Sequence, residues 1–166
     1  MHMTKETGTE DDLVASRAGA PGGDAYVRTF GAFCLFVNGE EVKFRLRKCK
    51  EFLAYLVDKR GAVVPMSEMI AALWPGHPED KAKLLYRNAK CRLCMLLRGL
   101  GLNDALILGY ARASLDPAAL ACDMWDYLDD ETDSSYAGEY MTDYAWPAAT
   151  RSRLDIVALR RGFAVN

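Results

Sequence analysis

Histidine, the residue that enzymes use most often for acid–base chemistry, is scarce in this chain. Its 166 residues include only two histidines, and they contain no glycine-rich phosphate loop, GxSxG elbow or HExxH motif. Long apolar runs are also missing, since no segment approaches the roughly 18–20 apolar residues that span a bilayer, and the polar start has no signal region. The sequence therefore predicts a cytoplasmic protein that is not an enzyme and needs no cofactor.

The five cysteines are an odd number at irregular spacing, which is typical of reduced thiols and not of a disulfide framework. Cys91 and Cys94 form a CxxC, but they fall in the middle of a predicted helix, and a structural zinc site usually has four ligands. We therefore expect no metal site. The acidic residues within 123–131 lack the spacing of a calcium loop, so a solvated helix face is the favoured interpretation of that cluster.

Charge is distributed unevenly, although the net formal charge is only −2. Residues 26–115 contain fifteen Lys and Arg against eight Asp and Glu, a net charge of +7. Residues 116–143 contain nine acidic residues and no Lys or Arg. A basic module followed by an acidic segment favours a nucleic-acid partner for the module, whatever the average charge of the chain.

The chain opens with residues 1–24, which are polar and rich in small residues, and we interpret them as a tag remnant and flexible linker. Apolar, β-rich segments follow, and Asn38-Gly39 between two of them is a strong hairpin signal. Short strands are expected at 26–31, 34–37, 42–45 and near 63–64.

Apolar residues spaced by three and four predict three helices in the middle of the chain. They are expected at 47–59, from Ser67 to Trp74, and from about Pro78 to Gly99; the third is basic on one face. A hairpin is expected after them, with Tyr110-Ala111 at its tip. Two further helices are expected at 123–130 and 147–161.

This order of elements is that of a winged helix-turn-helix. The expected fold class is α+β: an N-terminal antiparallel sheet, three helices and a C-terminal hairpin wing over residues 25–116. Residues 117–166 are expected to form a short acidic and aromatic helical extension. Such a domain has no catalytic apparatus, and its chemistry is charge and shape presented to double-stranded DNA.

The third helix supplies most of the predicted DNA contacts, because a helix fits the major groove. Arg pairs well with guanine and Asn with adenine, and small apolar side chains can touch a thymine methyl. An arginine near the hairpin tip can enter the minor groove. The predicted DNA-binding residues are Lys81, Lys83, Leu84, Arg87, Asn88, Lys90, Cys91, Arg92, Arg112, Arg47 and Lys48.

The segments VRTFGAFCLFVNGEEVKF, RKCKEFLAYLVDKRGAVV, SEMIAALWPG and DKAKLLYRNAKCRLCMLL together resemble the OmpR/PhoB-type winged-helix output domain. They look closest to the branch of the Streptomyces antibiotic regulatory proteins and related response regulators. Downstream, SLDPAALACDMWDYL and YAGEYMTDYAWPAATRSRL resemble the start of the bacterial transcriptional activation region, so that the resemblance covers about residues 26–154.

The resemblance implies a cytoplasmic transcription factor that binds tandem direct repeats, often as a dimer, as a response-regulator output domain or a small standalone regulator. The acidic segment is a candidate contact for RNA polymerase or for a neighbouring protomer. The chain departs from the family in its third helix, where Leu93 is followed by Cys94 and not by Arg, and position 91 is also Cys. The target sequence therefore does not carry over.

The apolar content of the third helix leaves an alternative open, namely a winged helix that serves as a protein-interaction or dimerisation module. In that case Leu84, Cys91, Cys94 and Met95 should form a contiguous apolar patch. If the helix binds DNA, basic side chains should interrupt that patch.

Overall fold

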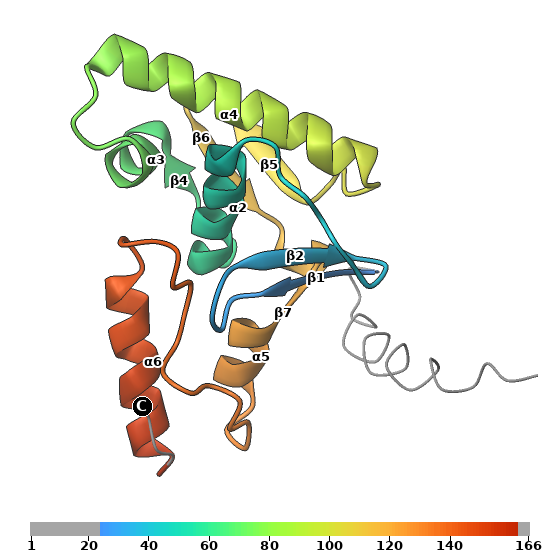
Figure 1. Cartoon of the computed structure of the whole chain (residues 1–166), viewed down its shortest axis with the longest axis vertical. Helices are drawn as coiled ribbons and strands as arrows, with labels where there is room; N and C mark the ends of the chain where they lie inside the picture. Colours follow the sequence, from blue (N-terminus) through green and yellow to red (C-terminus); the bar gives the residue numbers. More distant parts are fainter. Residues whose placement is uncertain (1–23, 163–166) are drawn as a thin grey trace, which may run out of the picture.

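A four-stranded sheet joins segments from distant parts of the sequence (Figure 1). The structure, a computed structural model, describes residues 24–162, so nearly all of the expected tag remnant and linker lies outside the described residues. The strand order is β3-β2-β1-β7. β1 pairs antiparallel with β2, and β7 runs parallel to β1. The strands are β1 (Ala25–Arg28), β2 (Cys34–Val37), β3 (Glu40–Glu41) and β7 (Ala121–Cys122).

The third strand differs from the expected one, because it comprises Glu40–Glu41 and not residues 42–45. The Val42 N–H still donates to the Leu35 carbonyl at 2.8 Å. β2 begins at Cys34, so the residues after 43 have no partner strand. They still alternate in exposure, with Phe44 and Leu46 half-buried between exposed basic residues. The alternation of apolar and basic residues in this part of the sequence thus reflects an extended segment that does not pair with a neighbouring strand.

The three central helices are α2 (Arg47–Lys59), α3 (Met66–Leu73) and α4 (Glu79–Gly99). All three lie within about a residue of the expected ranges. α2 ends where Arg60 adopts a left-handed conformation with φ of 43°, and Gly61 follows at φ of 91°. A φ of 91° is readily taken only by glycine, which explains why Gly61 follows the end of this helix.

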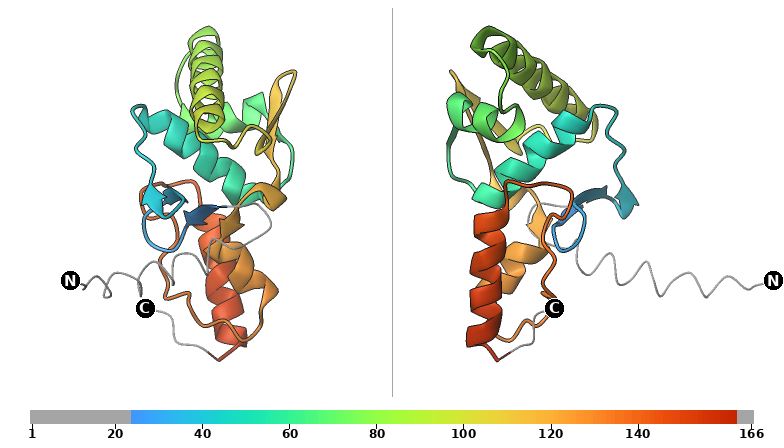
Figure 2. Two further views of the ribbon diagram at one scale, coloured as in Figure 1. Left: turned by 90° about the vertical axis from the view of Figure 1, so that its right-hand side faces the viewer. Right: turned by 60° about the vertical axis from the view of Figure 1, so that its left-hand side comes forward.

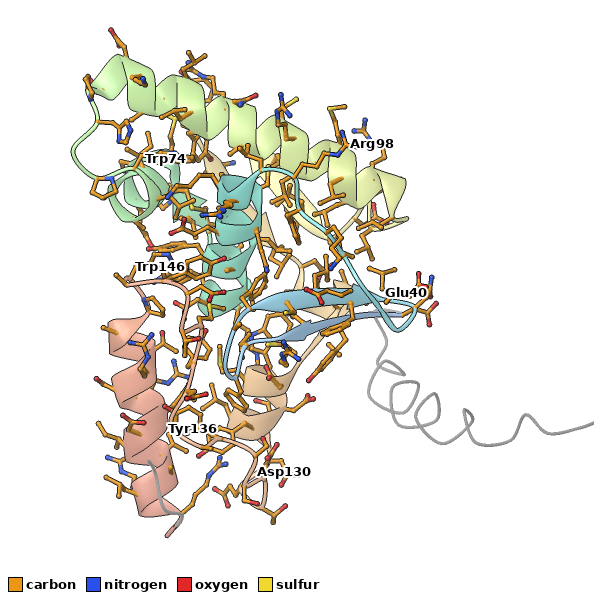
Figure 3. All side chains as sticks on the ribbon, viewed as in Figure 1. Glu40, Trp74, Arg98, Asp130, Tyr136 and Trp146 are labelled. Carbon is orange, nitrogen blue, oxygen red and sulfur yellow. The ribbon has the colours of Figure 1, made fainter. Side chains whose placement is uncertain are left out.

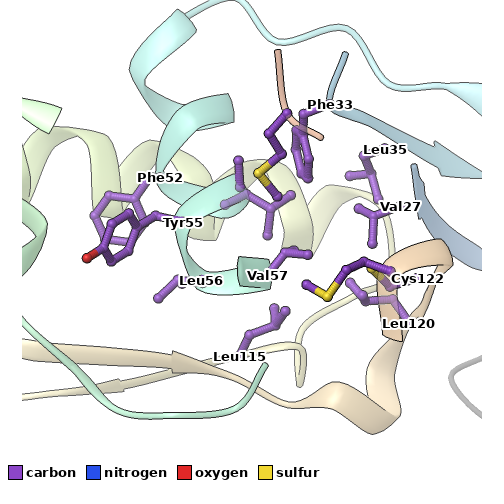
Figure 4. Close-up of a cluster of buried hydrophobic side chains, with 14 of the residues drawn as sticks. Val27, Phe33, Leu35, Phe52, Tyr55, Leu56, Val57, Leu115, Leu120 and Cys122 are labelled. Carbon is purple, nitrogen blue, oxygen red and sulfur yellow. The ribbon is translucent and has the colours of Figure 1, made fainter. Parts of the chain in front are cut away.

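α2 is the centre of the core, since every residue from Phe52 to Val57 is buried. Its apolar side chains meet Val27, Leu35 and Cys122 from the four-stranded sheet, and Leu115 from β6 (Arg112–Leu115) (Figure 4). α4 lies across the other side of α2 and buries Ala82, Tyr86, Ala89, Leu93 and Leu97. Burial on both sides fixes α2 and leaves one long face of α4 exposed.

The expected wing is present as a second, three-stranded sheet in the order β4-β6-β5. β5 and β6 form the hairpin, with Leu106 opposite Leu115 and Gly109 opposite Arg112. Its tip contains Ala111 at φ of 53°. The strands are β4 (Val64–Pro65), β5 (Leu106–Gly109) and β6 (Arg112–Leu115).

The expected boundary after residue 116 does not separate two bodies. β7 completes the first sheet, and the Trp125 indole N–H donates to the Val57 carbonyl of α2 at 3.2 Å. Trp146, labelled beside α2 in Figure 3, donates to the Glu51 carboxylate at 2.9 Å. The segment contains η1 (Pro117–Ala119), β7, α5 (Asp123–Asp129) and α6 (Ala148–Arg160).

The acidic cluster of α5 is not uniformly solvated, so the solvated-face interpretation is wrong for Asp123. That residue is only 6% exposed, and its carboxylate accepts hydrogen bonds from the backbone of Thr29 and Phe30. Asp129 is exposed and pairs with Arg60, whose guanidinium donates to Asp129 Oδ1 at 2.9 Å. The hydrogen bond from Arg60 holds the pKa of Asp129 below its ordinary value. The cluster therefore ties the extension to the rest of the fold.

Candidate nucleic-acid interface

The outer face of α4 follows one line of residues along the helix. Leu84, Asn88, Cys91 and Met95 recur at spacings of three and four, opposite the buried face, and all four are exposed. We call this line the crest. Leu84 is 65% exposed and Met95 63%, whereas Asn88 and Cys91 stand between them. The crest is thus mixed, with apolar side chains near its two ends.

One side of the crest faces the wing, and we call it the wing side. Arg87 and Lys90 of α4 line a pocket of about 260 Å³ together with Gly109, Tyr110 and Ala111 of the hairpin tip. The Lys90 ammonium lies 5.2 Å from the centroid of the Tyr86 ring, which is buried beneath it. Burial also raises the pKa of the Tyr86 phenol. The basic side chains of Arg87 and Lys90 on α4 therefore lie beside the aromatic side chain of Tyr110 at the tip of the wing.

The other side of the crest faces the segment between β3 and α2, and we call it the loop side. The views of Figure 2 show this segment and the wing on opposite sides of α4. Arg92 lies here, and its Nε donates to the Asn88 amide oxygen at 3.4 Å. Lys43 and Arg45 line the same pocket as Arg92. Basic side chains therefore border the crest on both sides.

Cys49 also lines the loop side, although it is buried. Its thiol donates to the Ala89 carbonyl of α4 at 3.4 Å. Burial raises the pKa of the Cys49 thiol, and the positive charge of Arg92 opposes that rise. This thiol joins α2 to α4 and fixes the helix from which Arg92 projects.

The predicted basic residues differ in how available they are. Lys81 and Arg47 are exposed. Lys83 pairs with Glu79 at 3.4 Å, one turn earlier on α4. Lys48 is engaged within the fold, because its ammonium donates to the Leu73 carbonyl at 2.7 Å and pairs with Glu51 at 2.8 Å. Of these four, Lys48 is the least able to reach a phosphate.

Arg112 is exposed at the start of β6, on the wing. Its side chain lies across Gly109 of β5, where an added Cβ would stand 2.6 Å from Arg112 Nε. A glycine opposite the arginine thus allows the guanidinium to lie close to the hairpin backbone. Nine of the eleven predicted residues lie along α4 or on the wing, with Arg112 and Arg87 on elements that share the wing side. The other two, Arg47 and Lys48, lie at the start of α2.

Tyr110 has no place in the predicted set, although it is 96% exposed at the tip of the wing. Lys43 and Arg45 are also absent from that set. The available signals were an aromatic residue at a hairpin tip and basic residues alternating with apolar ones through Leu46. Neither signal shows that these residues lie beside α4, because that depends on how the wing and the segment before α2 pack against this helix.

Cys91 and Cys94 lie on α4 without further metal-ligating neighbours. Within residues 24–162, no three His, Cys, Asp or Glu side chains come together in a way that could hold a metal ion. The Cys94 sulfur instead accepts a hydrogen bond from the Arg98 guanidinium at 3.8 Å. No helix in the same part of the chain is both long and apolar enough to span a bilayer.

Comparison with known proteins supports the fold. No family model matches this sequence, and no curated protein sequence matches it. A solved structure of Mycobacterium tuberculosis EmbR, in complex with a low-affinity phosphopeptide, is similar with a TM-score of 0.59 at 23% identity. The similarity covers 83% of this chain and 36% of the EmbR chain, so this chain spans little more than a third of that protein. The likeness confirms the mixed α+β, winged-helix type of fold.

Proposed function

We propose that this chain is the sequence-specific DNA-binding module of a transcriptional regulator, with α4 in the major groove and the wing at the minor groove. The observation that carries the proposal is the crest of α4 with basic side chains on both sides and the wing beside one of them. Lys and Arg on two sides of a helix neutralise the phosphates of both groove walls. The fold shared with EmbR supports the same assignment.

Within that arrangement each residue has a distinct role. Asn88 and Arg87 are the candidates for base contacts, since their side chains suit adenine and guanine. Leu84 and Cys91 offer apolar contact to a thymine methyl. Arg112 and Tyr110 lie on the wing and are the candidates for contacts in the minor groove. The phosphate contacts are Lys81, Lys83, Lys90, Arg92 and Arg47.

The finer assignments rest on the resemblance of the sequence to the OmpR/PhoB-type domains. On that basis the protein is a cytoplasmic regulator without enzymatic activity. It binds tandem direct repeats and forms a homodimer on DNA. The chain is then either the output domain of a two-component response regulator or a small standalone regulator. The acidic residues of the extension remain the candidate contact for RNA polymerase.

The test is selection of bound duplexes from sheared genomic DNA of the source organism, followed by fluorescence anisotropy at about 50 and 200 mM salt. An enriched repeat motif that keeps its advantage over random duplex while affinity falls with salt supports the proposal. Absence of both enrichment and salt-dependent binding contradicts it.

The second candidate is a protein-interaction module, and the exposure of Leu84 and Met95 is the observation that favours it. These two apolar side chains are eleven residues apart, about 16 Å along the helix axis. Cys91 lies one turn from Met95 and belongs to the same expected patch, whereas Asn88 separates Cys91 from Leu84. The basic Arg87 and Arg92 lie on either side of this line, so the expected apolar patch is interrupted at Asn88. Self-association that is lost in Leu84→Ser and Met95→Ser, in the absence of DNA binding, would favour this candidate.

A further inference from the structure

A second pocket lies on the loop side of α4, away from the wing. It has a volume of about 240 Å³ and is bounded by the segment from Lys43 to Leu46 on one side and by α4 around Arg92 and Leu96 on the other. In Figure 1 the chain between β3 and α2 passes along the second half of α4, and the residues that line the pocket come from these segments and from the start of α2. Nothing in the DNA-binding proposal requires a cavity at this place.

The mouth of this pocket is strongly positive. Lys43, Arg45 and Arg92 line it, and no Asp or Glu does. None of the three basic side chains forms an ion pair with any residue of the described part of the chain, 24–162. Arg92 makes a hydrogen bond of 3.4 Å to the Asn88 amide, which leaves most of its donors free. Three cations without a counter-charge around one cavity favour an anionic occupant.

The walls of the pocket are apolar, which a bare inorganic anion would not use. Phe44 and Leu46 contribute from the loop, and Met95 and Leu96 from α4. Small-molecule sites in proteins are mostly apolar, with a few polar groups that fix the orientation of the ligand. The volume is below the roughly 300–1,000 Å³ of drug-sized sites, so the occupant must be small.

We propose that this pocket binds a small amphipathic carboxylate, with its carboxylate on Arg45 and Arg92 and its acyl or aromatic body against Phe44, Leu46 and Leu96. Arginine is suited to this task, because its planar guanidinium can hold a carboxylate through two parallel hydrogen bonds. The ligand would bridge the loop and α4, which are otherwise joined at this place by side-chain packing.

Occupancy of the pocket has a consequence for DNA, and this step rests on the proposed function. Arg92 projects from α4 beside the crest, where it is a candidate phosphate contact. A carboxylate on Arg92 offsets that positive charge and occupies guanidinium donors that a phosphate would otherwise use. Binding of the ligand and binding of DNA therefore oppose each other, and each lowers the affinity of the other by the same factor.

The test uses octanoate as the probe, titrated into the full chain while backbone amide NMR shifts are followed. Saturable shifts at residues 43–49 and 92–96 are expected, with an affinity at least about tenfold above that of acetate, inorganic phosphate or octanol, or about 1.4 kcal/mol. Phosphate as good as octanoate would show a simple anion site of the kind that contacts DNA, and would overturn the proposal. Octanol as good as octanoate, or shifts without saturation, would overturn it equally.

Two arginine variants give the matched comparison. Arg45 is exposed, so Arg45→Gln should fold normally, and it is expected to weaken octanoate by about tenfold. Arg98→Gln removes the same charge from α4 outside the pocket, and less than about a twofold change is expected. Equal losses in the two variants would show a diffuse effect of charge and no site.

The DNA step is read separately from the pocket. If the wild-type chain binds a selected duplex, saturating octanoate should reduce that affinity severalfold, and unchanged affinity would refute the antagonism. If the chain binds no duplex, the proposed function fails, whereas the NMR titration still decides whether the pocket binds a carboxylate.

Discussion

The buried carboxylate of Asp123 holds Thr29, a residue 94 positions earlier in the chain. Asp123 Oδ1 accepts hydrogen bonds from the Thr29 N–H at 2.8 Å and from the Thr29 hydroxyl at 2.6 Å. The neighbouring Phe30 N–H donates to Asp123 Oδ2 at 3.1 Å. These bonds fasten the start of α5 to the end of β1, so the acidic extension is part of the structural unit that carries the candidate DNA-binding face.

Asp123→Ala should therefore destabilise the whole domain. The change leaves the Thr29 and Phe30 donors without an acceptor in a buried place, and we expect the free energy of unfolding to fall by about 3 kcal/mol or more. Urea unfolding measures it. Glu131→Ala, an exposed acidic residue shortly after α5, is the matched control and should change the value by less than about 0.5 kcal/mol. Similar values for the two variants would show that the acidic cluster acts only through net charge.

The alkaline limit of stability should be set by buried tyrosines. The Tyr140 hydroxyl donates to Asp58 at 2.8 Å, and that of Tyr136 donates to Asp155 at 2.7 Å. Burial first, and then the neighbouring carboxylate, raises the pKa of both phenols above the ordinary value. Above about pH 10 the unfolded chain has lost these protons while the folded chain retains them.

Stability should accordingly be complete below about pH 10 and fall as the pH rises beyond it, by up to about 1.4 kcal/mol per pH unit for each such phenol. Urea unfolding at a series of pH values measures the slope, and the ultraviolet absorbance of tyrosinate reports the ionisation. Tyr140→Phe should lower the free energy of unfolding at neutral pH. Above about pH 10 it should also make stability fall less steeply with pH, by the contribution of one proton. Ionisation of the buried phenols before unfolding would contradict the prediction.

The sequence was sufficient for the helices, because the spacing of buried residues in α2 and α4 is itself what makes them pack. It was insufficient wherever the partner is distant. β7 is a two-residue strand that exists only because β1 lies beside it, and no local pattern marks it. Tyr86 is only 1% exposed because it packs on Phe52 of α2, a contact between two helices that no local pattern in the sequence marks.

The candidate site shows the same division. Helical periodicity alone places Leu84, Asn88 and Cys91 on the exposed face of α4, and the structure has them there. Which basic residues remain available depends on contacts across the fold. Lys48 meets the end of α3, 25 residues later in the chain, and only the packing of α2 against α3 brings it there.

Lys48 and Arg47, neighbours in sequence, should therefore behave in opposite ways. Lys48→Met removes a hydrogen bond to the last turn of α3 and should cost about 1 kcal/mol of stability, with little effect on DNA affinity. Arg47→Ala should leave stability within about 0.5 kcal/mol, since the side chain is exposed. It should weaken all duplexes alike and reduce the salt slope by about 0.9. A loss of DNA affinity in Lys48→Met without a loss of stability would restore its phosphate role.

The tip of the wing offers a test of the minor-groove assignment. Tyr110 is 96% exposed, so Tyr110→Ala should not alter the free energy of unfolding measurably. If the wing reaches DNA, the variant should lose affinity, by about 1 kcal/mol if the ring stacks or packs on the backbone. Unchanged affinity for the selected duplex would remove the wing tip from the interface.

The two sides of the crest should differ in what they contribute to recognition. Arg87 lies on the wing side and is a candidate for a base contact, so Arg87→Ala should cost roughly 1–3 kcal/mol on the selected duplex and less on random duplex. Arg92 lies on the loop side, where it is a candidate phosphate contact. Arg92→Ala should weaken both duplexes by the same factor.

Anisotropy titrations of both variants on both duplexes at one salt concentration give the four affinities required. The ratio of selected to random affinity is the decisive quantity, because a phosphate contact cancels in it and a base contact does not. A ratio that falls in Arg87→Ala and stays constant in Arg92→Ala is the expected result. A constant ratio in both variants would leave Asn88 and the apolar crest as the source of specificity, since they are the side chains that remain between the two basic sides.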